Sequence, residues 1–384
     1  MRDRHASRQW PDRTQTLLLR AALLDGSAAV RAWEEWKVVA DPEHLDPGSQ
    51  RLIPQLFQNL RGEGVRDALL ESFKPAHRKT WTRNRVLFHV LGDLVRRLAE
   101  AGIDTLLLKG AALIPLAYRD YGRRPVGDLD VLVRLEQAPA AMALLRRQGW
   151  TPRYEFPERL IGPRHADDFV DPERRKVDLH WSVLQECCGR PWNEDFWAAR
   201  IPLAIDGVST SALCPADQLL HVCVHGTRSG PLQPVGWVAD AMMVLKASNG
   251  AIDWDRLLDQ TARRRLVVPM RGALRVLYGA LGAAIPVDVL ERIEAMPTSR
   301  TERWEHQVKT APRPLLGSLP VLWFDYARLA GDASLGRKLL GFPRYLQCTF
   351  RTKVLWGLPR DMLRLAAGRI GARVGTAAGS DRAP

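Results

Sequence analysis

Two aspartates separated by a single residue are the feature of this sequence best suited to chemistry. Asp128 and Asp130 lie in Asp128-Leu129-Asp130-Val131-Leu132-Val133, which has the alternation typical of a half-buried β-strand. Residues two apart on a strand share a face, so both carboxylates project together while Leu129 and Val131 point into the core. Adjacent carboxylates repel each other unless a cation joins them, and Mg²⁺ or Mn²⁺ binds carboxylate and phosphate oxygens. The spacing therefore predicts a divalent-metal site suited to a nucleotide.

A third acid is expected from a neighbouring strand. Asp178 lies in Lys176-Val177-Asp178-Leu179-His180, a second alternating run in which Asp178 and His180 share one face. If this strand pairs beside the first, three carboxylates converge and can hold two metals, which activate an attacking hydroxyl and stabilise a leaving pyrophosphate. His180 stands next to the bulky Trp181, so we interpret it as a packing or supporting residue rather than a base.

A glycine turn precedes this acidic motif. The short apolar run Ile103 to Leu108 has strand length, Lys109-Gly110 forms a turn, and Ala111 to Tyr118 is composed of helix formers. A glycine between a strand and a helix allows backbone N–H groups to approach phosphate oxygens, and the start of the helix adds a favourable dipole. We expect this turn to bind the phosphates of a nucleotide.

A zinc site is the alternative reading of the histidines. His221 and His225 are one helical turn apart, with Cys214 and Cys223 nearby. No glutamate accompanies them in the metalloprotease pattern, and Cys223 falls off their common face. The sequence disfavours zinc at this position.

Two other enzyme classes that use an Asp-x-Asp motif fit less well. A haloacid-dehalogenase phosphatase would have Thr or Ser closely after the second aspartate, where this chain has Val131-Leu132-Val133. A sugar-nucleotide glycosyltransferase would open with a nucleotide-binding strand, whereas the apolar periodicity of this chain predicts that it opens with helices.

The periodicity divides the chain into four predicted regions. Residues 1–101 form an N-terminal helical region whose longest helix runs from about Trp81 to Glu100 and ends at Gly102. Residues 102–212 interleave strands and helices as the catalytic core, and residues 213–296 return to helical spacing. Residues 297–384 form an extension rich in Pro, Trp and Arg. The predicted fold class is α+β, with a small mixed sheet and helices flanked by helical regions on both sides.

The net charge and the cysteine content indicate which kinds of partner and which cellular compartment to expect. The formal net charge is +13, which favours polyanionic partners. The tail beyond Arg337 contains only Asp361 and Asp381 as acids; its last dozen residues have a disordered composition, and its basic and apolar residues suit weak contact with an anionic membrane or a nucleic acid. No stretch approaches membrane-spanning length. Five scattered cysteines argue against a disulfide framework, so we expect a reducing cytoplasm.

Several of these motifs occur together in a known family. The matching segments are Leu107–Leu113, Arg124–Val133 with Gly127-Asp128-Leu129-Asp130, Val177–Trp181, Pro215–Gly226, and, further on, Trp237, Asp240 and Asp253-Trp254. In combination they resemble the uncharacterised bacterial nucleotidyltransferase family of the polymerase-beta-like superfamily, over roughly Leu17 to Leu281. The resemblance also raises Asp240 from an ordinary surface acid to a helix-packing residue or a residue at the rim of the active site.

The resemblance implies a polymerase-beta-like core that transfers a nucleoside monophosphate from a nucleoside triphosphate such as ATP to an acceptor. Asp128, Asp130 and Asp178 would bind the metals, and Gly110 would be the nucleotide-turn glycine. The superfamily usually places Gly or Ser next, where this chain has Ala111, so a hydroxyl contact to phosphate is missing.

Phosphate binding would then fall to backbone donors and Lys109, with Arg123 and Arg124 as flexible candidates on the following loop. Two other functions stay open. One is a catalytically weakened module that binds nucleotide or RNA, and the other is an enzyme that modifies a peptide or a protein.

Overall fold

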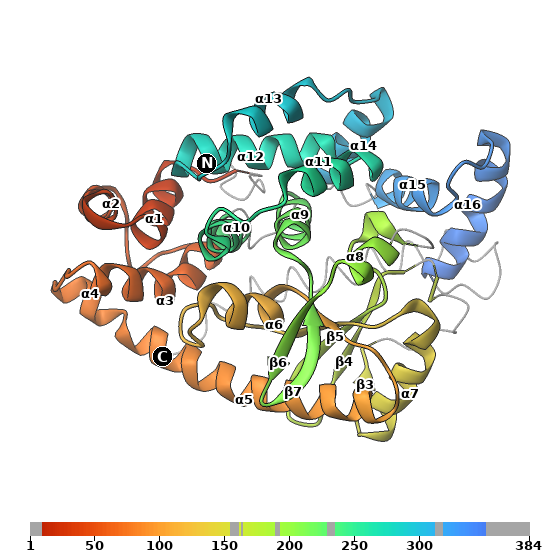
Figure 1. Cartoon of the computed structure of the whole chain (residues 1–384), viewed down its shortest axis with the longest axis horizontal. Helices are drawn as coiled ribbons and strands as arrows, with labels where there is room; N and C mark the ends of the chain where they lie inside the picture. Colours follow the sequence, from red (N-terminus) through yellow and green to blue (C-terminus); the bar gives the residue numbers. More distant parts are fainter. Residues whose placement is uncertain are drawn as a thin grey trace, which may run out of the picture.

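Five helices form the N-terminal part of the protein, drawn in red and orange in Figure 1. The computed structural model describes residues 10–153, 161–162, 164–188, 193–228, 235–311 and 318–350. The first helices are α1 (Arg13–Leu23), α2 (Gly26–Val39), α3 (Pro47–Gly62), α4 (Ala68–Ser72) and α5 (Lys74–Glu100). The longest, α5, ends where the sequence predicts, and Gly102 beyond it has φ +71°, a left-handed conformation that glycine adopts at little cost. It begins at Lys74, about two turns before the predicted start.

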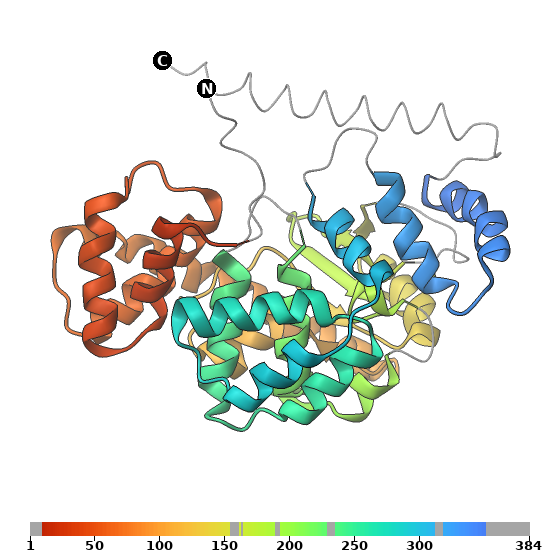
Figure 2. The same ribbon diagram turned by 90° about the horizontal axis from the view of Figure 1, so that it is seen from above.

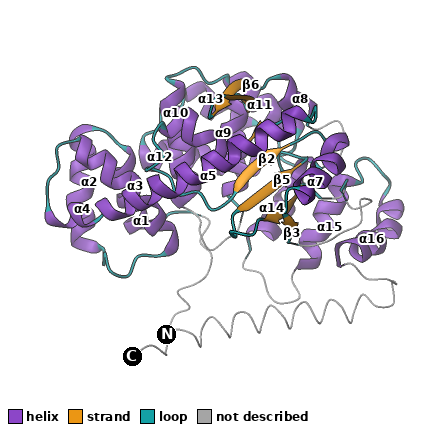
Figure 3. Ribbon diagram, turned by 90° about the horizontal axis from the view of Figure 1, so that it is seen from below, coloured by secondary structure: helices purple, strands orange, loops and turns teal. Residues whose placement is uncertain are grey.

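A seven-stranded mixed sheet forms the centre of the molecule, and it confirms the α+β class. The strands are β1 (Leu106–Leu107), β2 (Leu129–Leu132), β3 (Thr151–Pro152), β4 (Ala166–Val170), β5 (Lys176–His180), β6 (Ile201–Ile205) and β7 (Val208–Ala212). Their order is β3-β4-β5-β2-β1-β7-β6, which places β2 in the middle. All four residues of β2 are buried, so the strand is not the half-buried one that its alternation indicated. Helices cover both faces of the sheet (Figure 3).

The segments around β1 differ in detail from the prediction. The strand is only two residues long, and the chain enters helix α6 (Lys109–Leu113) directly at Lys109. This helix continues as one π-helical turn, η1 (Ile114–Tyr118), and stops at Arg119, whose φ is +54°. After β2, a 3₁₀ turn η2 (Leu135–Gln137) leads into α7 (Ala138–Arg147), as the helical pattern there predicts.

The two faces of the sheet belong to different hydrophobic cores. Leu129 and Val131 pack in one core with residues of α5 and α7. Leu132 belongs to the other core, which contains α9 (Pro215–Gly226), α10 (Val235–Ser248) and the N-terminal helices. Asp130 is two residues from Leu132 and therefore shares its face. The acidic side chains thus face the helices that follow the sheet in sequence.

Helices make up the described chain after β7, apart from short connections. They include α11 (Trp254–Arg263), α12 (Val267–Leu281), α13 (Val287–Ala295), α14 (Arg300–Thr310), α15 (Ser318–Leu329) and α16 (Leu335–Phe350). A short helix, α8 (Glu194–Ala198), and a 3₁₀ turn, η4 (Gln185–Cys187), precede them. Seen from above in Figure 2, the N-terminal helices and α15–α16 lie at opposite ends of the molecule.

No helix in the described part of the chain combines the length and apolar character needed to cross a membrane. The basic and apolar residues predicted to touch a membrane or a nucleic acid, such as Trp356 and Arg360, and the terminal residues of disordered composition lie outside the described residues. The four predicted regions and their boundaries stay a prediction.

Candidate metal and nucleotide site

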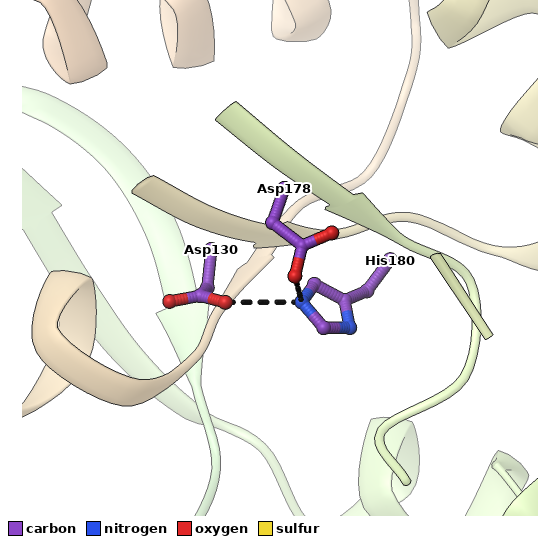
Figure 4. Close-up of side chains that lie close together, drawn as sticks. All are labelled: Asp130, Asp178 and His180. Carbon is purple, nitrogen blue, oxygen red and sulfur yellow. Dashed lines mark hydrogen bonds and ion pairs between the residues drawn. The ribbon is translucent and has the colours of Figure 1, made fainter. Parts of the chain in front are cut away.

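Strand pairing brings two of the predicted acids together. The strands β2 and β5 run parallel, and their register sets Asp130 directly beside Asp178. Residues in register on parallel strands share a face of the sheet, and Figure 4 shows the two carboxylates on the same side. The Asp130 side chain is only 2% exposed and that of Asp178 15% exposed. Two carboxylates so far from water require cations beside them.

His180 supplies one of these cations. Its Nε2 lies 3.0 Å from Asp130 Oδ1 and 2.9 Å from Asp178 Oδ2, so one ring atom bridges both carboxylates (Figure 4). Burial opposes its charge, but the negative charge of Asp178 and the hydrogen bond that His180 donates to Asp130 outweigh burial and raise the pKa of His180 to about 9. In return, the imidazolium outweighs burial and holds the pKa of Asp178 well below its ordinary value. Among the described residues, Nδ1 of His180 has no hydrogen-bond partner.

Lys109 supplies the second cation. Its Nζ lies 2.6 Å from Asp130 Oδ1 and 3.7 Å from Asp178 Oδ2. Burial disfavours the ammonium, yet the two carboxylates raise the pKa of Lys109 above its usual range. The backbone of Lys109, the first residue of α6, has φ +43°, a strained conformation for a residue with a side chain. The strained turn therefore aims the ammonium at the acids.

The donor set fits a divalent cation. Asp130, Asp178 and His180 each offer one ligand atom, and these atoms lie within 4.8 Å of one another. Carboxylate oxygens suit Mg²⁺ and Mn²⁺, and imidazole is a common ligand for transition metals. Asp128 is not part of this group. It is an exposed residue that comes just before β2, although loss of hydration and the nearby Asp130 raise its pKa.

Gly110 packs against the side chain of Arg124. It is buried in α6, and a side chain at this position would meet the Arg124 guanidinium and, at 2.8 Å, Cγ2 of Val126. Arg124 donates from Nε to Asp240 Oδ1 at 2.7 Å and from Nη2 to Asp240 Oδ2 at 2.8 Å. Tyr118 donates its hydroxyl to the same carboxylate at 2.8 Å. The absence of a side chain at Gly110 therefore leaves room for this network, whatever the backbone N–H groups bind.

One of the predicted phosphate contacts, Arg124, is not the flexible side chain that the sequence led us to expect. Both oxygens of Asp240 hold it. Asp240 is 9% exposed and packs between helices, and Ala111 is fully buried. Arg123 lies on the loop as predicted, 3.7 Å from Asp120, with its Nε buried and without a hydrogen-bond partner.

The histidine pair on α9 belongs to no group of three metal ligands within the described part of the chain. The rings of His221 and His225 lie 5.8 Å apart and are tilted by 54°. Burial, together with the nearby Lys109, lowers the pKa of both rings, so both are neutral. Cys214 and Cys223 are free thiols.

Comparison with known proteins agrees with the nucleotidyltransferase resemblance. A nucleotidyltransferase-like antigenic protein from Paracoccidioides brasiliensis has 20% identity and a TM-score of 0.34, covering 53% of this chain and 96% of its own. The antibiotic-resistance factor ANT(2'')-Ia has 12% identity and a TM-score of 0.34, covering 50% of this chain and 95% of its own. No curated protein gives a significant match. Residues 48–279, more than half of the chain, match the family described as "Uncharacterised nucleotidyltransferase", and the chain belongs to that family.

Proposed function

We propose that the protein transfers a nucleoside monophosphate from a nucleoside triphosphate to an acceptor hydroxyl or phosphate and releases pyrophosphate. The observation that carries the proposal is the direct pairing of Asp130 with Asp178, buried and joined by His180, in a chain of a nucleotidyltransferase family. Evolution rarely keeps two carboxylates beside each other in a protein interior without a function for their charge.

Asp130 and Asp178 would hold the metal, with His180 as a third ligand or as the support that orients them. The exposed Asp128 would complete the set from the edge of the site. A divalent ion bound there would neutralise the triphosphate and make the attacking oxygen more nucleophilic. Mg²⁺ or Mn²⁺ and ATP are the proposed cofactor and first substrate to test.

The residues of the chain contribute mainly by positioning charge. Lys109 is held against Asp130 by one charge-assisted hydrogen bond, so its ammonium is suited to move to phosphate oxygens when they arrive beside the acids. Arg124 is tied to Asp240 and would fix the turn at Gly110 rather than follow the phosphates.

One observation favours a second function. Lys109 and His180 already neutralise Asp130 and Asp178 without any metal, and Ala111 removes a hydroxyl from the turn. A nucleotide- or RNA-binding module that has lost catalysis would retain this internally neutralised cluster. Binding of nucleotide that is independent of divalent metal would support this alternative.

The test compares three carboxylates on one sheet face. Asp130→Asn and Asp178→Asn remove the proposed ligands, whereas Asp168→Asn is the matched control, because Asp168 pairs with Asp178 from the other side but is 42% exposed and lies outside the ligand group. Mn²⁺ binding is measured by calorimetry, and transfer is measured as labelled pyrophosphate released from each triphosphate. We expect both readouts to be lost in the first two variants and kept in the third.

Two outcomes would contradict the enzyme. Wild-type protein that binds no divalent ion, alone or with nucleotide, would remove the metal role. Equal Mn²⁺ affinity in the wild type and in Asp130→Asn with Asp178→Asn combined would do the same. Genomic neighbours and a mass shift on a candidate acceptor would separate a small molecule from a peptide or protein acceptor. Cytoplasmic location is a further proposal, supported by the free thiols at Cys187 and Cys188.

A further inference from the structure

A cavity of about 260 Å³ adjoins the acid cluster. It lies between α3, the loop before β2, α9 and α10. Helices that precede the sheet in the sequence and helices that follow it therefore both line the cavity. Lys109 lines this cavity and also contacts Asp130, so the cavity and the acid cluster share one wall. A molecule in the cavity would therefore reach the proposed metal site past a single side chain.

The charge of the cavity wall favours an anion. Four cationic side chains line it against one carboxylate, that of Asp240. Arg124 and Lys109 are paired with acids at hydrogen-bond distance, whereas Arg123 has only a longer contact of 3.7 Å with Asp120 and an Nε without a hydrogen-bond partner in the described structure. Arg51 donates to the carbonyl of Pro125 at 2.9 Å, and no ion pair is found for it among the described residues. Burial and the positive charge of the neighbouring Arg124 lower the pKa of Arg51. A bound anion would offset the repulsion between these two guanidinium groups.

Polar atoms at the same wall lack partners. Gln55 and His221 are each 2% exposed, and Trp237 is 5% exposed. In the described structure, Oε1 of Gln55, Nε2 of His221 and Nε1 of Trp237 have no hydrogen-bond partner, nor does Nε of Arg123. Such groups are rare in folded proteins and costly when they stay unsatisfied. A ligand that satisfies them would supply both acceptors and a donor, because the indole donates and the amide oxygen accepts.

The size of the cavity separates it from the triphosphate site. Small-molecule sites usually measure about 300–1,000 Å³. A cavity of about 260 Å³ suits a small molecule rather than a whole nucleoside triphosphate. The triphosphate belongs beside Asp130 and Asp178, where the metal would meet it, and the cavity is the separate space next to that position.

We infer that this cavity binds the acceptor, and that the acceptor is a small organic acid carrying a hydroxyl together with a phosphate or carboxylate group. The inference rests on the proposed function. Arg51 and Arg123 would bind the acidic group, while Trp237 and Gln55 would bind hydroxyl groups. In the transfer, the acceptor oxygen bonds to the α-phosphorus, the bond from that phosphorus to the bridging oxygen breaks, pyrophosphate leaves with the electron pair, and the hydroxyl proton passes to water.

Three probes that differ only in their acidic group test the site. Glycerol 3-phosphate, glycerate and uncharged glycerol are titrated into the full-length protein by calorimetry. We expect one or both acids to bind and glycerol not to bind. Arg51→Gln and Arg123→Gln should each weaken the binding roughly tenfold, since each removes a charge-assisted hydrogen bond. Trp237→Phe, which keeps an aromatic ring but removes the indole N–H, should weaken it less.

Arg83→Gln is the matched control. Arg83 is exposed, lies on α5 and acts electrostatically on Arg51, but it does not line the cavity. Its removal should change the affinity less than twofold if the site is the cavity rather than the general positive charge. An equal loss in Arg83→Gln and Arg51→Gln would contradict a built site. Absence of binding by both acids would also contradict the inference.

Competition with nucleotide tests whether the anion in the cavity is the acceptor or the phosphate chain of the nucleotide. Saturating ATP with Mg²⁺ should leave acid binding intact or strengthen it if the cavity holds the acceptor. Displacement of the acid by ATP would show that the cavity takes the phosphates of the nucleotide, and would overturn the assignment. Acid binding that persists while Asp130→Asn has no effect on metal binding or transfer would leave the site valid and refute the proposed function instead.

Discussion

Lys109 occupies the position in the acid cluster where a divalent cation would compete. Its ammonium is 2.6 Å from Asp130 and 3.7 Å from Asp178. Lys109→Met keeps the length of the side chain and removes the charge. Metal binding no longer has to displace a cation, so Mn²⁺ affinity without nucleotide should rise roughly tenfold or more. Nucleotide transfer should fall in the same variant, because a phosphate contact is lost. Calorimetry and a pyrophosphate assay measure the two effects.

A lysine on β5, the strand that carries Asp178, serves as the control for this charge effect. Lys176 is exposed at the start of β5, two residues before Asp178. Lys176→Met should leave Mn²⁺ affinity within about twofold, since exposed charges are strongly screened. If Lys109→Met failed to raise Mn²⁺ affinity, or lowered it, the ammonium would not be a competitor for the metal position.

Gly110 offers a steric prediction. The side chain of Gly110→Ala would meet the Arg124 guanidinium and Val126, both already fixed in place. We expect a loss of about 1–3 kcal/mol in the free energy of unfolding, the usual range for overpacking. Gly279→Ala is the opposite case, because nothing lies within 4 Å of a side chain there and the residue is exposed within α12. It should be neutral or stabilising by up to about 1 kcal/mol. Urea unfolding distinguishes the two, and equal values would refute the packing argument.

The sequence predicts some residues of the site better than others. The alternation of apolar and polar residues predicted that Asp130 and Asp178 lie on strands and that each side chain points away from its apolar neighbours. Alternation of this kind is a local property of the sequence. Asp128 was expected beside them, but β2 begins at Leu129, so the first carboxylate lies before the strand. The bridging contacts of His180 and the bond of Tyr118 to Asp240 join residues up to 122 positions apart. No local pattern reveals contacts of that range.

At the scale of elements, the hairpin β6–β7 was not predicted, although its turn has a recognisable pattern. Asp206 and Gly207 connect the two strands with φ +47° and +79°, the positive values that two-residue hairpin turns require. Asp-Gly between alternating residues is a strong hairpin signal. The strand residues here alternate only weakly, since Pro202 and the small Ala204 interrupt the apolar pattern. By contrast, the 3.6-residue period predicted α9 to α12 well.

The same turn provides a test. Gly207→Ala forces a side chain into φ +79°, which costs roughly 1–2 kcal/mol for a residue other than glycine. The edge pair β7–β6 should therefore lose that much stability, measured by urea unfolding and by faster amide exchange at Ser211. Ser209→Ala changes an exposed side chain of the same hairpin and should have little effect. An unchanged stability in Gly207→Ala would mean that the turn adopts another conformation.

At the scale of the whole molecule, the N-terminal helices and the helices that follow the sheet share one hydrophobic core. The N-terminal helices pack in one hydrophobic core with α9, α10 and α12, and Trp10 stacks edge-on against Trp237 of α10 at 6.0 Å. The cavity between α3 and α10 exists only because of this packing. Periodicity predicts each helix but not which helices share a core, since that depends on contacts far apart in the chain.

A buried ion cluster attaches the C-terminal helices to this body. Lys309 of α14 lies 3.1 Å from Glu186, 2.8 Å from Glu305 and 3.0 Å from Asp325. The other charged groups facing it are Arg228, which pairs with Glu186, and Arg328 of α15, which pairs with Glu305. The two cations nearest Glu305 outweigh burial and lower its pKa, and the same balance lowers the pKa of Glu186. Burial outweighs Lys309 at Asp325 and raises its pKa.

The directions of these shifts predict how stability depends on pH. A carboxylate with a lowered pKa contributes stability above its ordinary pKa, about 4.5 for glutamate, and loses it as the pH falls through the folded value. Glu186 and Glu305 therefore favour the folded state at neutral pH and not in acid. Asp325 has the opposite sign, because its ionised form is disfavoured on folding. Two groups against one predict a net loss of stability below about pH 4.5.

Lys309→Met tests this cluster, because it leaves three buried carboxylates with fewer cations. We expect a loss of roughly 3–5 kcal/mol in the free energy of unfolding at pH 7, the cost of removing one partner from a buried ion network. The loss should shrink as the pH falls toward 4, since protonation neutralises carboxylates that no longer have a cation. Lys246→Met removes a lysine from an exposed pair with Asp25 and should cost about 1 kcal/mol or less at either pH. Urea unfolding at both pH values measures this difference, and a loss independent of pH would show that the lost packing of Lys309, rather than its charge, accounts for the effect.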